Sequence, residues 1–201
     1  MKIGLYFGSF NPIHIGHLNV ANFILNETDI KKIWFIVSPQ NPLKANNTLL
    51  NEFARLHLVQ TAIEGDPRMK GSDIEFYLPK PSYTVDTLSY LKEKYPEHDF
   101  VIIMGGDSFQ NIEKWKNYKV ILENHKIYVY PRPGIETDTK GRPNVIKVNA
   151  PILEISATHI RNLIAKNKSI RYMVPEKVRE EIEAGGYYKT STKRDNPAAN
   201  R

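Results

Sequence analysis

The segment FGSFNPIHIGH, residues 7 to 17, combines two histidines, two glycines and a proline directly after an apolar run. His14 and His17 are three positions apart, so within one helical turn both imidazole rings would project toward the same side. This spacing fits a pair of metal ligands, a pair of buried or helix-capping rings, or a cradle for an anion. The segment lacks a neighbouring carboxylate, which disfavours a metal, and the spacing alone leaves the other two readings open.

A strand followed by a helix would position this segment. Lys2–Phe7 is a compact apolar run, and His17–Asn26 places Leu18, Ala21 and Ile24 on one helical face. The segment would then form the first turn between a strand and a helix, at the carboxyl edge of a parallel sheet, where ligands bind. Gly8 would let the backbone approach a ligand closely, and the helix N-terminus would offer N–H groups to an anion.

The rest of the chain alternates between strand and helix patterns. The predicted strands are Lys2–Phe7, Lys32–Ser38, Phe100–Met104, Lys126–Tyr130 and Asn144–Val148. The predicted helices are His17–Asn26, Glu52–Glu64, Thr84–Glu93, Asn111–Leu122, Ala157–Ala165 and Glu176–Ala184. Strands that are apolar throughout, each followed by a helix, predict an α/β fold: a Rossmann-like doubly wound parallel sheet of about five or six strands with helices on both faces.

Composition narrows the class of protein. The chain has 201 residues, 41% hydrophobic and 25% charged, which predicts a single domain over residues 1–188 and a disordered polar tail over 189–201. Cysteine is absent, which excludes disulfides and thiolate metal sites. The apolar runs are too short to span a membrane and no signal peptide is visible, so we expect a cytoplasmic protein. The net charge of +6 suits an anionic partner or simple solvation; we expect neither nucleic acid nor a membrane as partner.

A second motif, ISATHIR, stands at residues 155 to 161, near the other end of the chain. GSFNPIHIGH and ISATHIR together resemble the G-x-F-x-P-x-H-x-G-H and I-S-x-T-x-I-R motifs of the nucleotidyltransferase superfamily. The tetrapeptide HIGH also occurs in class I aminoacyl-tRNA synthetases. The two motifs here are too close together for such a synthetase, and no KMSKS-like segment appears.

Five further segments resemble the bacterial nicotinate mononucleotide adenylyltransferases of that superfamily. They are PQNPLK at 39–44, SYTVDTL at 82–88, MGGDSF at 104–109 followed by Trp115, PRPG at 131–134 and YMVPEKV at 172–178. The resemblance covers the chain from Lys2 to about Tyr188. The chain departs from the family at Lys116, where an aromatic residue is frequent, and after Ser38, where the common double proline is missing.

The resemblance implies transfer of AMP from ATP to nicotinate mononucleotide, giving nicotinate adenine dinucleotide and pyrophosphate. A phosphate oxygen is already a nucleophile, so this reaction needs cations and hydrogen-bond donors rather than a general base. Mg²⁺ is implied as well, held mainly by the ATP phosphates and water. The alternatives are another adenylyl- or cytidylyltransferase, with nicotinamide mononucleotide or phosphopantetheine as acceptor, and a nucleotide-binding module without turnover. The oligomeric state stays open.

Roles for single residues follow from the same resemblance. The expected catalytic residues are His14, His17, Lys44 and Arg161. The expected ATP-binding residues are Gly8, Ser9, Phe10, Gly105, Gly106, Asp107, Arg132, Ile155, Ser156 and Thr158. Tyr83, Thr84 and Trp115 are expected to form the acceptor pocket, with Trp115 stacking on the pyridine ring. The simpler alternatives are a plain helix cap for Ser156, solvated charges for Lys44 and Arg132, and a core position for Trp115.

Overall fold

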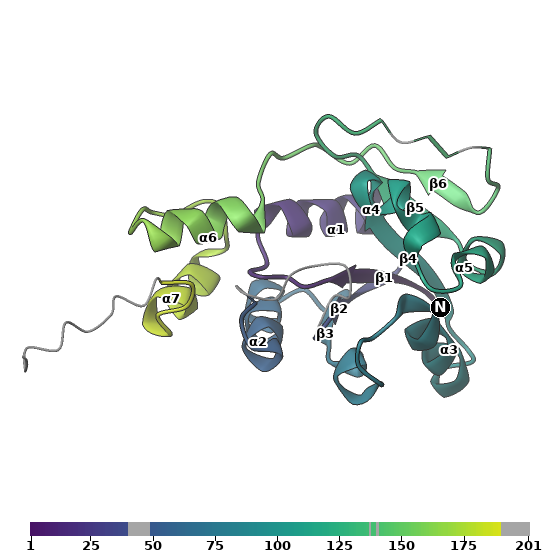
Figure 1. The fold of residues 1–201 in the computed structure, drawn as a ribbon, viewed down its shortest axis with the longest axis horizontal. Helices are drawn as coiled ribbons and strands as arrows, with labels where there is room; N and C mark the ends of the chain where they lie inside the picture. Colours follow the sequence, from purple (N-terminus) through teal and green to yellow (C-terminus); the bar gives the residue numbers. More distant parts are fainter. Residues whose placement is uncertain (40–48, 137, 140, 190–201) are drawn as a thin grey trace, which may run out of the picture.

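A computed structural model describes residues 1–39, 49–136, 138–139 and 141–189. Within these ranges six strands form one sheet in the order β3-β2-β1-β4-β5-β6, and every neighbouring pair is parallel. The strands are β1 Lys2–Gly8, β2 Lys32–Val37, β3 Met69–Ser72, β4 Asp99–Gly105, β5 Ile127–Tyr130 and β6 Val145–Lys147. The predicted doubly wound parallel sheet is therefore confirmed (Figure 1).

The sequence did not predict β3, whose residues are MKGS. A strand that contains lysine and glycine has no run of β-branched or aromatic residues to mark it. It forms because β2 offers it a parallel partner at the edge of the sheet, in the register Ile33 to Met69 through Ile36 to Ser72. A Cβ added to Gly71 would lie 3.2–3.3 Å from side-chain atoms of Leu56, Val59 and Gln60, so the glycine lets the preceding helix, Glu52–Ala62, pack closely on the strand.

The helices are α1 Ile15–Glu27, α2 Glu52–Ala62, α3 Thr84–Lys94, α4 Gly106–Gln110, α5 Tyr118–Asn124, α6 Ala157–Ala165 and α7 Glu176–Ala184, with short 3₁₀ turns η1 Ile74–Tyr77 and η2 Ile112–Lys114. The bounds of α6 and α7 are those predicted. The continuous helix predicted over Asn111–Leu122 is wrong. Trp115 has extended backbone and Asn117 has a left-handed φ of 52°, so the chain breaks into η2 and α5. Asparagine tolerates that conformation because its short side chain can hydrogen-bond locally.

Two hydrophobic clusters cover the two faces of the sheet. One cluster joins the strands to α1, α2, α6 and α7 through residues such as Ala21, Val59 and Ile160. The other joins them to α3, α4 and α5 through Leu88, Phe109 and Ile121. Alternate residues of each strand enter opposite clusters, as a pleated strand requires. In Figure 1, α6 and α7 lie at the end of the molecule that is farther from the N-terminus. β1 runs toward that same end.

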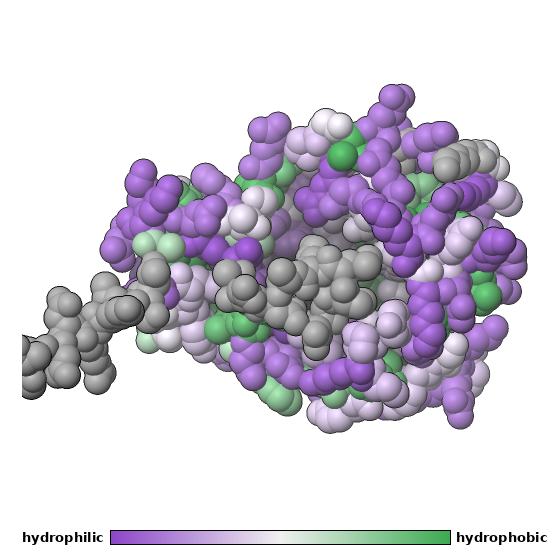
Figure 2. Space-filling model, viewed as in Figure 1, coloured by the Kyte–Doolittle hydropathy of each residue, from purple (hydrophilic) through white to green (hydrophobic). Residues whose placement is uncertain are grey.

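Hydrophilic residues cover most of the face seen in Figure 2, and hydrophobic residues are scattered among them. Within the described ranges, no helix is both long enough and apolar enough to cross a membrane.

Candidate active site

The turn between β1 and α1 is supported by the ring of Phe10. This residue has a left-handed φ of 44°, and its side chain is only 2% exposed. The ring packs edge-on against Tyr6 and against His17, whose centroid is 5.2 Å away. A Cβ added to Gly8 would lie 2.8 Å from this ring. The close approach that Gly8 permits in this structure is therefore that of the Phe10 ring, and this ring packs against His17.

The two histidines of the turn lie against each other. His14 is the residue before α1 and His17 is in its first turn. Their rings are stacked with centroids 3.7 Å apart and 28° between the planes. The backbone N–H of His14 donates to Nδ1 of His17 over 3.3 Å, which fixes how the His17 ring is turned. The spacing of three residues thus does place both rings on one side.

His14 is a neutral base in this environment. His14 is 2% exposed. Burial lowers the pKa of its imidazole to about 4, and the charge of Arg132 is a second cause. Its Nδ1 is buried and has no hydrogen-bond partner among the described residues. A Cβ added to Gly16 would lie 3.0 Å from this nitrogen, so the glycine of the HIGH tetrapeptide leaves room for the ring. The sequence could not decide whether this histidine is charged; burial decides for the neutral form.

This pKa predicts a loss of stability in mild acid. The folded pKa of about 4 lies below the ordinary value of about 6.5, so below pH 6.5 the unfolded chain takes up a proton that the fold refuses. The loss should grow by up to ~1.4 kcal/mol per pH unit, or about 2 kcal/mol between pH 7 and 5, and should level off below pH 4. Urea unfolding at pH 7, 6 and 5 measures it in the wild type and in His14→Asn, which cannot titrate.

His125, whose pKa is also lowered by burial, contributes equally to both proteins and cancels in the comparison. Parallel pH dependences in the two proteins would show that His14 does not cause the loss.

A cluster of polar side chains continues the site at the ends of β4 and β5. Arg132 Nη2 donates to the hydroxyl of Tyr130 over 3.1 Å, and Tyr6 donates to the same hydroxyl over 3.0 Å. Arg132 Nε lies 3.5 Å from a carboxylate oxygen of Asp107. A Cβ added to Gly105 would lie 2.5 Å from that oxygen, so this glycine makes room for the pair of charges. Arg132 is thereby an ordered cation at the site rather than a solvated loop charge.

Gly106, which is also expected to bind ATP, begins α4 and is buried.

A pocket lies between the turn after β1 and the loop after β5. Its lining comes from β1 and α1, from the loop after β5, and from the segment before α6: Tyr6, Gly16, His17, Val20, Tyr130, Pro131, Arg132, Pro133, Pro151, Ile152 and Leu153. The pocket brings His17 and Arg132 to one space, although 115 positions of sequence separate them.

The second motif closes the site from α6. Ser156 precedes the helix, and its hydroxyl accepts a hydrogen bond from the backbone N–H of His159 over 3.2 Å, so the predicted N-cap is present. Arg161 donates to the carbonyl of Asn11 over 2.7 Å and to the Thr158 hydroxyl over 3.2 Å. The carbonyl of Ile155 lies 3.8 Å from the position of a Cβ on Gly16. The two motifs predicted to act together are therefore in contact.

The residues assigned to the acceptor pocket lie on the face of the sheet that α3, α4 and α5 cover, opposite to α1 and α6. Tyr83 and Trp115 are partly buried and pack against the same cluster, that of α3 to α5, while Thr84 is the first residue of α3. Lys116 Nζ lies 2.9 Å from a carboxylate oxygen of Asp86 and 4.8 Å from the centre of the Tyr83 ring. This ion pair ties the segment that carries Trp115 to α3. Lys44 lies outside the described residues, as does the tail from residue 190.

Arg55, which belongs to none of the motifs found in the sequence, is fully buried on α2. Its guanidinium donates to four backbone carbonyls of the described residues: Leu50 at 2.7 Å, Ser9 at 2.6 Å, Ser38 at 2.8 Å and Pro39 at 3.2 Å. It thereby joins the turn after β1 to the end of β2 and to the segment before α2. Spacing was the available signal, since residue 55 precedes the buried Leu58 and Val59 by three and four positions.

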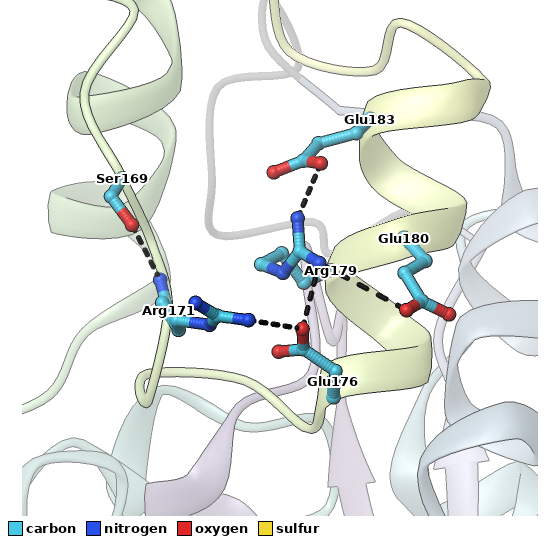
Figure 3. A network of polar contacts seen from close by, with 6 residues as sticks. All are labelled: Ser169, Arg171, Glu176, Arg179, Glu180 and Glu183. Carbon is cyan, nitrogen blue, oxygen red and sulfur yellow. Dashed lines mark hydrogen bonds and ion pairs between the residues drawn. The ribbon is translucent and has the colours of Figure 1, made fainter.

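The YMVPEKV segment supports the start of α1. The carbonyl of Met173 accepts the backbone N–H of Ile15 over 2.9 Å, so the first N–H of that helix is already engaged. Figure 3 shows Arg171 and Arg179 converging on Glu176, with distances of 3.1 and 2.7 Å to the same oxygen. Arg179, and after it Arg171, lowers the pKa of Glu176 to about 2. The Met173 carbonyl thus supports the start of α1, and the ion pairs of Glu176 support the start of α7.

The donors of the site are nitrogens and hydroxyls. Across the described ranges, no group of three or more histidine, cysteine, aspartate or glutamate side chains could hold a metal ion. Among the described residues, Arg132 and Arg161 bring guanidinium cations to this site.

The chain is similar to known proteins over most of its length. The family model described as cytidylyltransferase-like matches residues 5–163. A protein of Cytophaga hutchinsonii named "Probable nicotinate-nucleotide adenylyltransferase" is 53% identical over 189 residues, which cover 94% of this chain and 98% of that protein. A protein of the same name from Flavobacterium johnsoniae is 52% identical over 192 residues, which cover 94% and 100%.

A solved structure, Plasmodium falciparum nicotinic acid mononucleotide adenylyltransferase complexed with NaAD, superposes with a TM-score of 0.80. The match covers 93% of this chain and 97% of that one, at 22% sequence identity. At such an identity the match shows a shared fold.

Proposed function

The chain belongs to the cytidylyltransferase-like family and, within it, to the nicotinate-nucleotide adenylyltransferases, and from this premise we propose how its residues carry out the reaction. The reaction is adenylyl transfer from ATP to nicotinate mononucleotide, with nicotinate adenine dinucleotide and pyrophosphate as products. The observation that carries the proposal is the 2.7 Å hydrogen bond from Arg161 to Asn11, which joins the two phosphate-binding motifs across 150 positions.

The chemistry requires no proton transfer at the attacking atom. An oxygen of the acceptor's 5′-phosphate forms a bond to the α-phosphorus of ATP, and the bond from that phosphorus to the bridging oxygen of the β-phosphate breaks. The electron pair leaves with pyrophosphate. Both reactants are anions, so the protein must align them and stabilise the charge on the α-phosphoryl oxygens.

The side chains divide this work as follows. His17 donates to the α-phosphoryl oxygens from its fixed ring orientation, with neutral His14 stacked against it. Arg132 and Arg161 supply positive charge, and the N-terminus of α6 with Ser156 and Thr158 receives the β- and γ-phosphates. Lys44 remains assigned to a substrate phosphate.

The nucleoside parts occupy the neighbouring strand ends. Gly105 and Gly106 border the adenosine, and Asp107 accepts a ribose hydroxyl while Arg132 holds its carboxylate in place. On the other side, Tyr83, Thr84 and Trp115 receive the pyridine ring.

Mg²⁺ would be held mainly by the ATP phosphates and water, and it would supply charge neutralisation on the polyphosphate. We place the protein in the cytoplasm, where the acceptor and ATP would meet it.

Pyrophosphate release with ATP tests this assignment. The acceptors are nicotinate mononucleotide, nicotinamide mononucleotide and phosphopantetheine, with CTP in place of ATP as a matched control. We expect the highest kcat/KM with ATP and nicotinate mononucleotide. Faster turnover of another acceptor would move the chain to a different transferase, and no pyrophosphate with any acceptor would identify a binding module.

A further inference from the structure

Glu75, in the 3₁₀ turn η1, is a carboxyl group in the interior of the protein. Its residue is 2% exposed, and it is the one acidic residue among the buried polar and charged residues of the described ranges. None of the ion pairs found in those ranges includes it. Burying a carboxylate without a cation costs stability, so a purely structural role would be filled at lower cost by an apolar side chain.

The partners of Glu75 are hydroxyls of the SYTVDTL segment. Ser82 donates to one carboxylate oxygen over 2.8 Å, and Thr87 donates to the other over 2.9 Å. Both residues are buried, at 8% and 0% exposed. The Thr87 hydroxyl also lies 3.3 Å from the carbonyl of Tyr83. A single carboxylate therefore holds both ends of the six residues that begin α3.

The Ser38 hydroxyl reaches Glu75 as well, from the end of β2. The carbonyl of the same Ser38 accepts from Arg55. Burial nevertheless raises the pKa of Glu75 above its ordinary value, against the effect of these hydrogen bonds. The carboxyl group thus connects the start of α3 to the end of β2, at the same edge of the sheet as the turn after β1.

Between Ser82 and Thr87, which bind Glu75, two side chains point away from it toward Lys116. Tyr83 and Asp86 both contact Lys116, the neighbour of Trp115. Ser82 and Thr87 turn inward to Glu75, while Tyr83 and Asp86 turn toward the segment that carries the tryptophan. The spacing of the SYTVDT motif is explained by these two sets of contacts.

We propose that Glu75 is a positioning residue for the acceptor: it fixes Ser82 and Thr87, and through them sets Tyr83 and Thr84 at the distance from Trp115 that the pyridine mononucleotide requires. This inference rests on the proposed function, because it presupposes that these residues receive the acceptor. Glu75 itself touches neither substrate. Ser82 and Thr87, although part of the motif, are anchors rather than ligands.

The test is Glu75→Gln, which keeps the shape of the side chain and replaces one acceptor oxygen with a donor. We expect KM for nicotinate mononucleotide to rise on the order of tenfold, as for the loss of one hydrogen bond to a charged group, while KM for ATP and kcat change less than about threefold. Steady-state pyrophosphate release with each substrate varied in turn measures both values.

Thr87→Val and Ser82→Ala keep Glu75 and remove one hydroxyl each, so they test the proposal even if Glu75→Gln folds poorly. Each should raise KM for the acceptor alone, and Glu75→Gln combined with Thr87→Val should be no worse than Glu75→Gln. Ile127→Val, in the same cluster but on β5, is a control for general loosening of the core and should leave both KM values unchanged.

A parallel rise of both KM values, or a fall in Tm with both KM values unchanged, would assign Glu75 a structural role only. Absence of turnover of nicotinate mononucleotide by the wild type would overturn the proposed function instead. The two failures are therefore separate.

Discussion

Replacing His17 with alanine should lower kcat by on the order of 10²-fold or more, the usual effect of losing one preorganised donor to a developing charge. The structure orients this ring through the N–H of His14 and seats it on Phe10, so its donor would meet the α-phosphoryl group without reorganisation. A contribution made in the transition state appears in kcat more than in substrate affinity. Binding of ATP should fall much less, because the α6 terminus and Arg161 remain.

The ring of His17 also packs against Phe10 and Tyr6, so the variant will lose some stability. Tm, ATP binding and single-turnover rate are therefore measured on one preparation. His57→Ala is the matched control: the same chemical change on the exposed side of α2, where His57 faces Glu181. A lowered Tm for His17→Ala with single turnover close to the wild type would refute the catalytic assignment.

Replacing Arg55 with methionine should cost about 3–5 kcal/mol of folding free energy, which corresponds to a fall in Tm of roughly 6–20 °C for a chain of this size. Methionine fills a similar volume but leaves the carbonyls of Leu50, Ser9, Ser38 and Pro39 without their donor. Each buried carbonyl left without a partner costs about 1–3 kcal/mol, less where water can enter. Thermal and urea unfolding measure the loss.

Two further arginine variants make this result specific. Arg55→Lys keeps the charge but presents a single ammonium, so it should retain part of the lost stability. Arg68→Met removes an arginine that pairs with Asp66 at the surface, and it should cost no more than about 1 kcal/mol. An Arg55→Met protein with a Tm within 2 °C of the Arg68→Met protein would contradict the assigned role.

The sequence determined the class of fold and the meeting of the two motifs. Compact apolar runs separated by amphipathic segments predict a parallel sheet, and such a sheet brings the turn after its first strand to the ligand-binding edge. The bounds of α6 and α7 also followed from local signals, since Ser156 caps one helix and Pro175 precedes the other. These features depend on residues close together in the chain, where spacing and side-chain type carry the information.

Local signals failed where a distant neighbour decides the outcome. The edge strand β3 exists because β2 lies beside it, and the helix predicted over Asn111–Leu122 breaks where Trp115 turns toward the core. A periodic pattern shows which face of a helix or strand is apolar. It does not show which element pairs with a strand, or where packing interrupts a helix.

The electrostatics of the site were decided by the tertiary structure alone. Arginine and glutamate usually lie at the surface of a protein. Only the assembled fold surrounds Arg55 with carbonyls and Glu75 with hydroxyls. The same holds for His14, whose charge is removed by burial and by Arg132, a residue 118 positions away. A charge responds to every group and to the solvent around it, so its state is fixed by three-dimensional surroundings that no short stretch of sequence contains.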